Sequence, residues 1–148
     1  MSTEYHTSAQ NINPGSFVGQ YTINPNASIS NTTIDDAVIQ TELSAQIRDG
    51  YLPAPQLDNE GNPVTYYAVY FPHGVTVTAS GASSCVVGGF CAYHGAVAAA
   101  DSRNEYFYGV HPDFQAGSGC DTGCGTGTTF ESICQVSSKS LVGMMTGT

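Results

Sequence analysis

The residues of this chain that could do chemistry include five cysteines, which form two close pairs and one single residue: Cys85 and Cys91, Cys120 and Cys124, and Cys134. Both pairs lie among Gly and Ser, where a loop can bend enough for disulfide geometry. We therefore expect each pair to close a short local disulfide, which indicates an oxidising compartment. The alternative is a zinc site that adds His94, but the spacings C-x5-C-x2-H and C-x3-C differ from the usual C-x2-C knuckle and favour disulfides. Cys134 falls inside a helical pattern and is expected to be a buried thiol.

Three histidines form the second group of candidates. His73, His94 and His111 each lie next to a Pro or Gly or close to one, at the ends of expected strands. An alternative catalytic site could use His94, or it could pair His111 with Asp113 as base and orienter and take Ser118 as the nucleophile. Hydrogen-bonded loop histidines are the simpler interpretation.

The segment Gly117–Gly127 is a Gly-rich loop that follows an expected strand and opens a helix. Such a loop can cradle a phosphate at the helix N-terminus. The segment has no G-x-G-x-x-G register and no Lys after a glycine, and Asp121 would repel an anion. We interpret it as a tight loop whose glycines allow a short bridge between Cys120 and Cys124.

The elements that must position these residues follow from periodicity. A helix is expected over 34–49, capped by Thr33, and a second one over 128–145, where Thr128 and Glu131 form a capping box. The second helix carries a predicted buried face of Phe130, Cys134, Ser137, Leu141 and Met145. Strands are expected over 64–71, buried on both faces, and over 75–78 and 106–110, with a further short strand within 17–23.

These elements predict an α+β fold, with a small mixed or antiparallel sheet, two main helices and long disulfide-bridged Gly-rich loops. The length fits a single domain over residues 1–148, divided into a loop-rich arm (1–31) and an α+β core (32–148).

Composition excludes several classes of function. The chain has three basic and twelve acidic residues and a net charge of −9, so it lacks the basic surface that nucleic acids or anionic membranes require. No apolar run approaches the about 20 residues of a membrane span. Residues 1–10 contain neither a basic nor an apolar segment, so we expect no secretion signal within them.

Five consecutive blocks lie between residues 66 and 138: YYAVYFPHGVTVT, SCVVGGFCAYHG, YGVHPD, SGCDTGCG and TTFESICQVSS. Together with the turn Gly50–Pro55, they resemble a family of secreted zinc-metallopeptidase-like proteins that is distantly similar to the plant EXORDIUM (phosphate-induced) proteins. The resemblance implies export, bridged cysteines, a zincin-like fold and a helix that carries the motif S-S-H-E-L-V-E-x-x-T-D-P. In such a motif, residues at i and i+4 can bind one Zn²⁺, and the Glu at i+1 can act as a general base.

This chain departs from the motif at its chemical positions. Lys139 stands at the His position, Ser140 at the Glu position and Gly143 at the next acidic position, with Gly147 and Thr148 in place of Asp and Pro. A protonated lysine cannot bind zinc, and a serine is not a base. We therefore expect no catalytic residue in the motif and no cofactor, zinc being implied only for intact relatives. The resemblance also indicates that the chain is the middle of a larger domain.

Three hypotheses of function remain. The first is a non-catalytic, extracellular structural or binding protein derived from this family, which could self-associate into homo-oligomers through exposed strand edges. The second is an active secreted hydrolase or metallopeptidase that uses other residues, around His94, His111 and Asp113. The third is a module that binds carbohydrate or cell wall through some of its nine tyrosines, although strand tyrosines usually serve packing.

Overall fold

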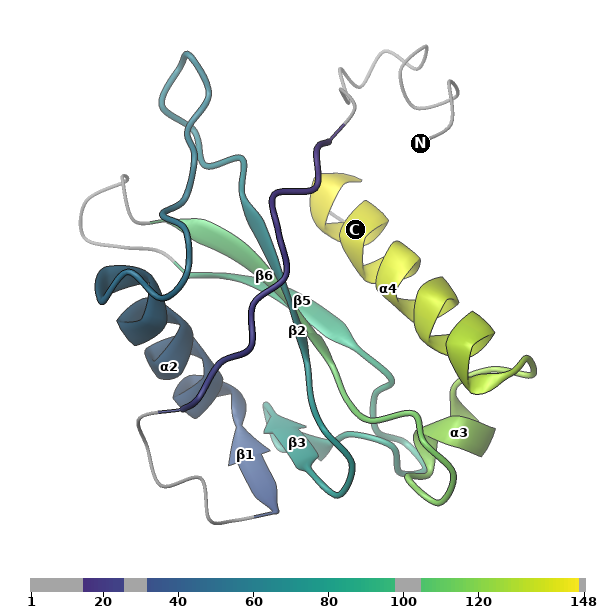
Figure 1. Cartoon of the computed structure of the whole chain (residues 1–148). Coiled ribbons are helices and arrows are strands. Elements are labelled where there is room, and N and C mark those ends of the chain that lie inside the picture. Colours follow the sequence, from purple (N-terminus) through teal and green to yellow (C-terminus); the bar gives the residue numbers. More distant parts are fainter. Residues whose placement is uncertain (1–14, 26–31, 98–104, 147–148) are drawn as a thin grey trace, which may run out of the picture.

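Two three-stranded sheets and two long helices make up the α+β fold in the computed structural model, which describes residues 15–25, 32–97 and 105–146 (Figure 1). The main sheet has the strand order β2-β6-β5, and the small sheet has the order β1-β3-β4. Each sheet contains one parallel and one antiparallel pair, so both are mixed, whereas the sequence predicted one sheet that was either mixed or antiparallel. No helix within the described ranges is long and apolar enough to cross a membrane.

The main sheet is built around β6 (Tyr106–His111), which pairs with β2 (Tyr66–Tyr70) in parallel and with β5 (Tyr93–Val97) in the antiparallel direction. Successive side chains of a strand point to opposite faces. Residues 106, 108 and 110 face helix α2, and residues 107, 109 and 111 face helix α4. The two helices therefore cover opposite faces of this sheet (Figure 1).

The small sheet supports the start of α2. It joins β1 (Thr33–Asp35) to β3 (Thr76–Ala79), and β3 turns back into β4 (Ala82–Ser83). The two residues of that turn, 80 and 81, both have positive φ, which is the geometry of a type I′ hairpin. The core lies between this sheet, α2 and the main sheet, and its buried residues are Ile34, Ile39, Leu43, Leu52, Val77, Tyr106, Tyr108 and Val110.

Helix α2 (Asp36–Arg48) begins two residues later than predicted. Residues 33–35 pair with β3 as a strand instead, and Asp35 takes the N-cap position, where its carboxylate accepts from the amide of Ala37 at 3.1 Å. The predicted apolar stripe is confirmed, because Ile39 and Leu43 are buried and Ile47 packs against the core.

Helix α4 (Thr129–Thr146) begins with the predicted capping box. The carboxylate of Glu131 accepts from the backbone and hydroxyl of Thr128 at 2.8 and 2.9 Å, and the amide of Glu131 donates to that hydroxyl at 3.3 Å. The prediction of this face needs correction at its start, since Phe130 is 75% exposed and Cys134 is exposed, whereas Ser137 contacts the buried His111. The fully buried residues of the helix are Ser132 and Ser140. The sheet face beneath the helix presents tyrosine hydroxyls and a glycine, so small polar side chains fit against it better than bulky apolar ones.

Three strand predictions also need correction. β2 is an outer strand with Tyr70 54% exposed, whereas we expected burial on both faces. β5 was missed, because its sequence YHGAV has no alternation and its pairing with β6 defines it. The segment 17–23 forms no strand, and Ile23 nevertheless packs against the core.

Candidate functional site

Two disulfides join the loop after β4 to the loop after β6, and they pair Cys85 with Cys120 and Cys91 with Cys124. The prediction that these four cysteines form disulfides is confirmed, but the predicted local pairing is wrong. The Gly-rich loop holds one helical turn, α3 (Cys120–Gly123), in which the amide of Cys124 donates to the carbonyl of Cys120 at 3.1 Å. Backbone hydrogen bonds likewise close the loop at Cys85, whose amide donates to the carbonyl of residue 90 at 3.0 Å. Backbone hydrogen bonds thus fix the conformation of each loop, and the disulfides connect one loop to the other.

The fifth cysteine does not behave as predicted. Cys134 has a free, exposed thiol, whereas its helical pattern predicted a buried one. Cys134 belongs to the part of the predicted face of α4 that is exposed, together with Phe130.

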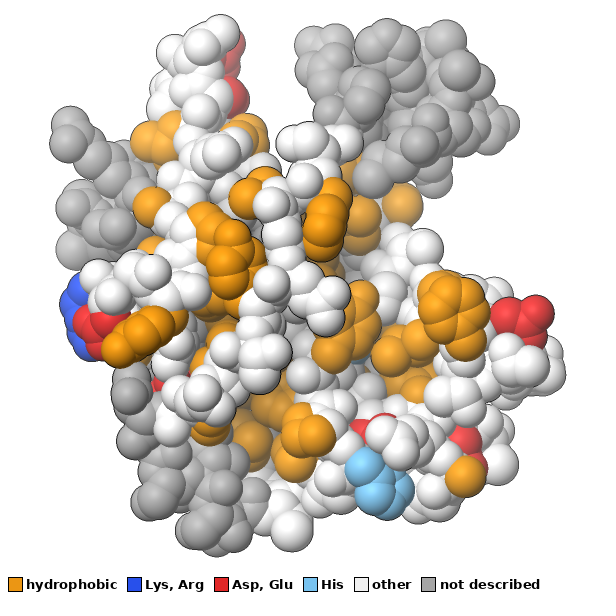
Figure 2. All heavy atoms as spheres, in the orientation of Figure 1, with side chains coloured by type: hydrophobic (Ala, Val, Ile, Leu, Met, Phe, Trp, Pro, Cys, Tyr) orange, Lys and Arg blue, Asp and Glu red, His pale blue; other side chains and the backbone are white. Residues whose placement is uncertain are grey.

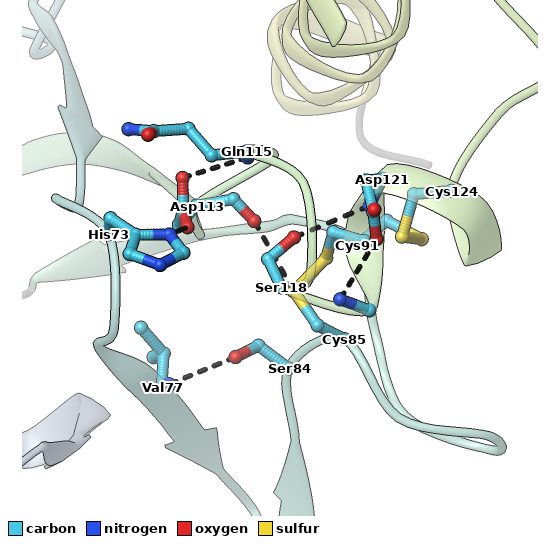
Figure 3. The surroundings of a disulfide bond; sticks show 12 residues. His73, Val77, Ser84, Cys85, Cys91, Asp113, Gln115, Ser118, Asp121 and Cys124 are labelled. Atoms are coloured by element: carbon cyan, nitrogen blue, oxygen red, sulfur yellow. Dashed lines mark hydrogen bonds and ion pairs between the residues drawn. A yellow bond between two sulfur atoms is a disulfide. The ribbon is translucent and has the colours of Figure 1, made fainter.

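A cavity of about 200 Å³ lies beside the Cys85–Cys120 bridge. Three segments far apart in the sequence line it: the turn after β2 with His73, the end of the small sheet with Ser84, and the loop after β6 with Asp113 and Ser118. Figure 3 shows His73, Ser84 and Ser118 placed around the same space, next to the disulfide.

His73 and Asp113 form the only ion pair at this cavity among the residues that the structure describes. His73 Nδ1 lies 2.6 Å from Oδ2 of Asp113 (Figure 3), and the carboxylate is only 6% exposed, while the His73 side chain is 56% exposed. The other carboxylate oxygen accepts from the amide of Gln115 at 2.9 Å. Because Nδ1 is bonded to this carboxylate, Nε2 is the ring nitrogen left for another partner; it accepts a hydrogen bond in a neutral ring and donates one in a protonated ring.

The predicted pairing of His111 with Asp113 is therefore wrong, because His73 takes the carboxylate. His111 ends β6 with its side chain toward α4, whereas Asp113 lies beyond Pro112 in the loop. Sequence proximity suggested the wrong partner, and the true pair spans 40 positions of the chain. His73 was among the candidate histidines, but no local signal identified its partner.

His111 is fully buried beneath α4. Its ring stacks on Tyr70 with centroids 4.7 Å apart, and its Nδ1 lies 3.5 Å from the hydroxyl of Ser137. Its Nε2 atom is buried without a hydrogen-bond partner. Burial lowers the pKa of His111 to about 4, so the ring is neutral at pH 7. Next to it, a Cβ at Gly109 would overlap the Tyr66 hydroxyl, so a larger residue there requires the Tyr66 ring to shift.

The remaining predicted site residues do not converge on a metal site. His94 is a partly buried residue of β5 that pairs with Gly109, and it does not line the cavity. On α4, Lys139 is exposed and Gly143 is partly buried. No group of three or more His, Cys, Asp or Glu side chains among the described residues is arranged to hold a metal ion.

Ser140, which the sequence analysis compared with the Glu of the motif, packs between α4 and the main sheet. It is 6% exposed, and its hydroxyl lies 3.2 Å from the Tyr66 hydroxyl and donates to the carbonyl of Tyr93 at 3.4 Å. These contacts join α4 to two strands of the main sheet.

The opposite face of the sheet holds a polar cluster that the sequence did not indicate. Asp36 of α2 accepts from the hydroxyls of Tyr93 and Tyr108, both of which contact Oδ1, at 2.6 and 2.9 Å. Burial, followed by the hydrogen bonds to this carboxylate, raises the pKa of both tyrosines well above the usual value. One turn further along the helix, Gln40 donates to Asp36 and to Tyr108 at 2.7 and 3.0 Å. The polar side chains of this cluster therefore form hydrogen bonds with one another.

Comparison with known proteins adds no relative: no family model, no curated protein and no solved structure matches the chain.

Proposed function

We propose that this chain is a non-catalytic, extracellular binding protein of metallopeptidase-like descent. The observation that carries the proposal is the environment of Ser140, since its hydroxyl lies between Tyr66 and the carbonyl of Tyr93. A residue that holds the helix to the sheet in this way has a packing role. The side chains at the other two motif positions, a lysine and a glycine, supply neither a metal ligand nor a base at neutral pH.

The alternative of an active hydrolase centred on His73 and Asp113 is disfavoured by the backbone around the cavity. Acyl transfer needs N–H groups that are free to stabilise an oxyanion. The amides of Gly117 and Gly119 both donate to the Asp121 carboxylate, at 2.9 and 3.0 Å. The amide of Ser118 donates to the carbonyl of Gln115 at 3.0 Å. The backbone N–H groups beside Ser118, the candidate nucleophile, therefore already donate hydrogen bonds within their own loop. This favours binding over catalysis.

The extracellular part of the proposal rests on the two disulfides. Structural disulfides persist in oxidising compartments and are rare in reducing ones. Here they link two loops whose cysteines are 35 and 33 positions apart, so they constrain the unfolded chain considerably. Cys85 of the first bridge lines the cavity, which supports a preformed binding site outside the cell.

The self-association part of the proposal rests on strand edges. β2 and β5 are the outer strands of the main sheet, and outer strands offer unpaired backbone groups to a second copy. Size-exclusion chromatography with light scattering tests this directly: a dimer or larger species supports it, and a monomer over the whole accessible concentration range contradicts it.

The central test is a metal and activity assay on the purified full chain with its disulfides intact. We expect no stoichiometric zinc after incubation with zinc and dialysis, and no hydrolysis of unstructured protein substrates. The matched control is the double variant Lys139→His, Ser140→Glu, which restores the first two motif positions and should bring back at most weak metal binding. Stoichiometric zinc together with chelator-sensitive hydrolysis by the unmodified chain would overturn the proposal.

A further inference from the structure

We infer that the cavity beside His73 binds one neutral, hydroxyl-rich group of the size of a single pyranose sugar. This inference rests on the proposed binding function and names the site and the ligand class. Its first support is the rigidity of the walls. The Cys85–Cys120 bridge and the His73–Asp113 pair tie the three lining segments to one another. A preformed cavity avoids the entropic cost of ordering loops when a ligand binds.

Charge selects a neutral ligand. No Lys or Arg lines the cavity, and the one histidine there already contacts the Asp113 carboxylate, so no cationic group is left to pair with an anion. A metal cation is equally disfavoured, since Asp113 is already bonded to His73 and to the amide of Gln115 and no second carboxylate lines the site. The net charge of −9 makes the surroundings unfavourable to anions as well.

The hydrogen-bonding groups select hydroxyls. The hydroxyl oxygen of Ser84 accepts from the amide of Val77 at 3.0 Å, and that of Ser118 accepts from the amide of Asp121 at 3.4 Å. Each serine has thus used its oxygen as an acceptor and retains its own O–H as a donor. His73 Nε2 adds a third polar atom, which accepts a hydrogen bond in a neutral ring and donates one in a protonated ring. A ligand that both donates and accepts at neighbouring atoms matches this set, and vicinal hydroxyls of a sugar do so.

Size and shape limit the ligand to one small ring. Sites for drug-sized ligands have volumes of about 300–1,000 Å³, and this cavity is smaller, at about 200 Å³. Val75 and the disulfide supply an apolar part of the wall against which the C–H face of a sugar ring can pack. Because few contacts are available, we expect affinities of about 1 mM or weaker for a monosaccharide. A polymer with many such units would be retained through avidity if several copies of the chain associate.

The experiment is a nuclear magnetic resonance titration of the ¹⁵N-labelled full chain with N-acetylglucosamine and the methyl glycosides of glucose, galactose and mannose. Glucuronate serves as the anionic counterpart. At least one neutral sugar should give saturable shifts at the amides of Gly74, Cys85 and Ser118, and glucuronate should bind at least fivefold more weakly. A polysaccharide built from the best monosaccharide then distinguishes a polymer ligand from a free sugar.

Two variants locate the site. Ser118→Ala removes one cavity hydroxyl and should weaken binding at least fivefold, whereas Ser138→Ala, an exposed serine of α4, should leave it unchanged. Should the first variant fail to fold, the pattern of shifted amides in the unmodified chain still decides the question. The inference is overturned if no neutral sugar gives saturable shifts at these amides, or if the shifts map to exposed tyrosines such as Tyr21 and Tyr51. Such a failure leaves the metal and activity test untouched, so it can be told apart from a failure of the proposed function.

Discussion

Mild acid should destabilise this protein through His111, and the direction follows from its burial. The pKa of His111 is lowered to about 4 in the folded chain because the ring is buried, whereas an unfolded histidine titrates near 6.5. Between these two values the unfolded chain binds a proton that the folded chain does not. The stabilisation is therefore complete above pH 6.5 and is lost progressively as the pH falls toward 4.

The magnitude follows from the same two values. Each unit of difference in pKa corresponds to about 1.4 kcal/mol, so His111 alone should cost about 3 kcal/mol of the free energy of unfolding by pH 4. A domain of this size has a total stability of about 5–15 kcal/mol, so the loss is a large share. Protonation would place a charge beside Tyr70 and Ser137, neither of which is an anion that could compensate it.

The assay is urea unfolding followed by circular dichroism at a series of pH values from 7 to 4, with the disulfides intact. The comparison variant is His111→Gln, which keeps a polar side chain but cannot titrate. At pH 7 the variant should be the less stable protein, since it loses the stacking on Tyr70. The stability difference between the two proteins should shrink by about 3 kcal/mol as the pH falls to 4.

Protonation of carboxylates whose pKa values are lowered also reduces the free energy of unfolding in acid; examples are Asp58, Asp121 and Glu131. This reduction is the same in both proteins, so it cancels from the difference between them. A difference that stays constant across the series would refute the reasoning. It would mean that His111 is already protonated in the folded chain or gains a partner for Nε2.

Three further predictions concern packing and covalent structure. Gly109→Ala should cost about 2 kcal/mol, because the added Cβ overlaps a tyrosine hydroxyl, while Gly123→Ala, with no atom within 4 Å, should be close to neutral in thermal melts. Asp36→Asn should cost about 1–3 kcal/mol and lower the pH at which the buried tyrosines ionise, measured by tyrosinate absorbance; an unchanged alkaline titration would contradict the role of the carboxylate. Non-reducing peptide mapping should find Cys85 linked to Cys120, and finding a locally bridged peptide instead would reject the pairing.

The sequence predicted those parts of the fold that carry an apolar period or a local cap. The stripe of α2 and the capping box of α4 were readable, because neighbours three or four positions apart determine them. The buried face of α4 was not readable, since it consists of serines that fit against tyrosine hydroxyls of the sheet. The predicted face included Phe130 and Cys134, and both of these lie exposed.

The site was harder to predict because its contacts are non-local. Cysteine spacing shows that bridges are feasible, but four cysteines allow three pairings, and only the fold brings the loops after β4 and β6 together. Similarly, Asp113 has a histidine two positions away and another 40 positions away, and strand alternation turns the nearer one, His111, toward α4. The sequence identified the cysteines and histidines as candidates, but their partners could be assigned only from the topology of the fold.

The scarcity of charge has a structural counterpart inside the fold. The charged side chains on the face in Figure 2 are few, and the ion pairs among the described residues are an exposed Arg48–Asp49 contact and the His73–Asp113 pair. Hydrogen bonds between hydroxyl groups, rather than ion pairs, connect the main sheet to the helices on both of its faces. Tyr106 meets the hydroxyl of Ser44 of α2 at 2.9 Å, and Tyr66 meets that of Ser140 of α4 at 3.2 Å.

The contacts of Ser140 show why an uncharged side chain suits this position of α4. A glutamate in the side-chain position of Ser140 would bring a carboxylate against the Tyr66 hydroxyl and the carbonyl of Tyr93, where burial would penalise its charged form. Serine satisfies the same space with a neutral hydroxyl that donates to the carbonyl, and it needs neither a metal nor a counter-charge. In this chain α4 is therefore held to the sheet by uncharged hydrogen bonds, which salt screens little.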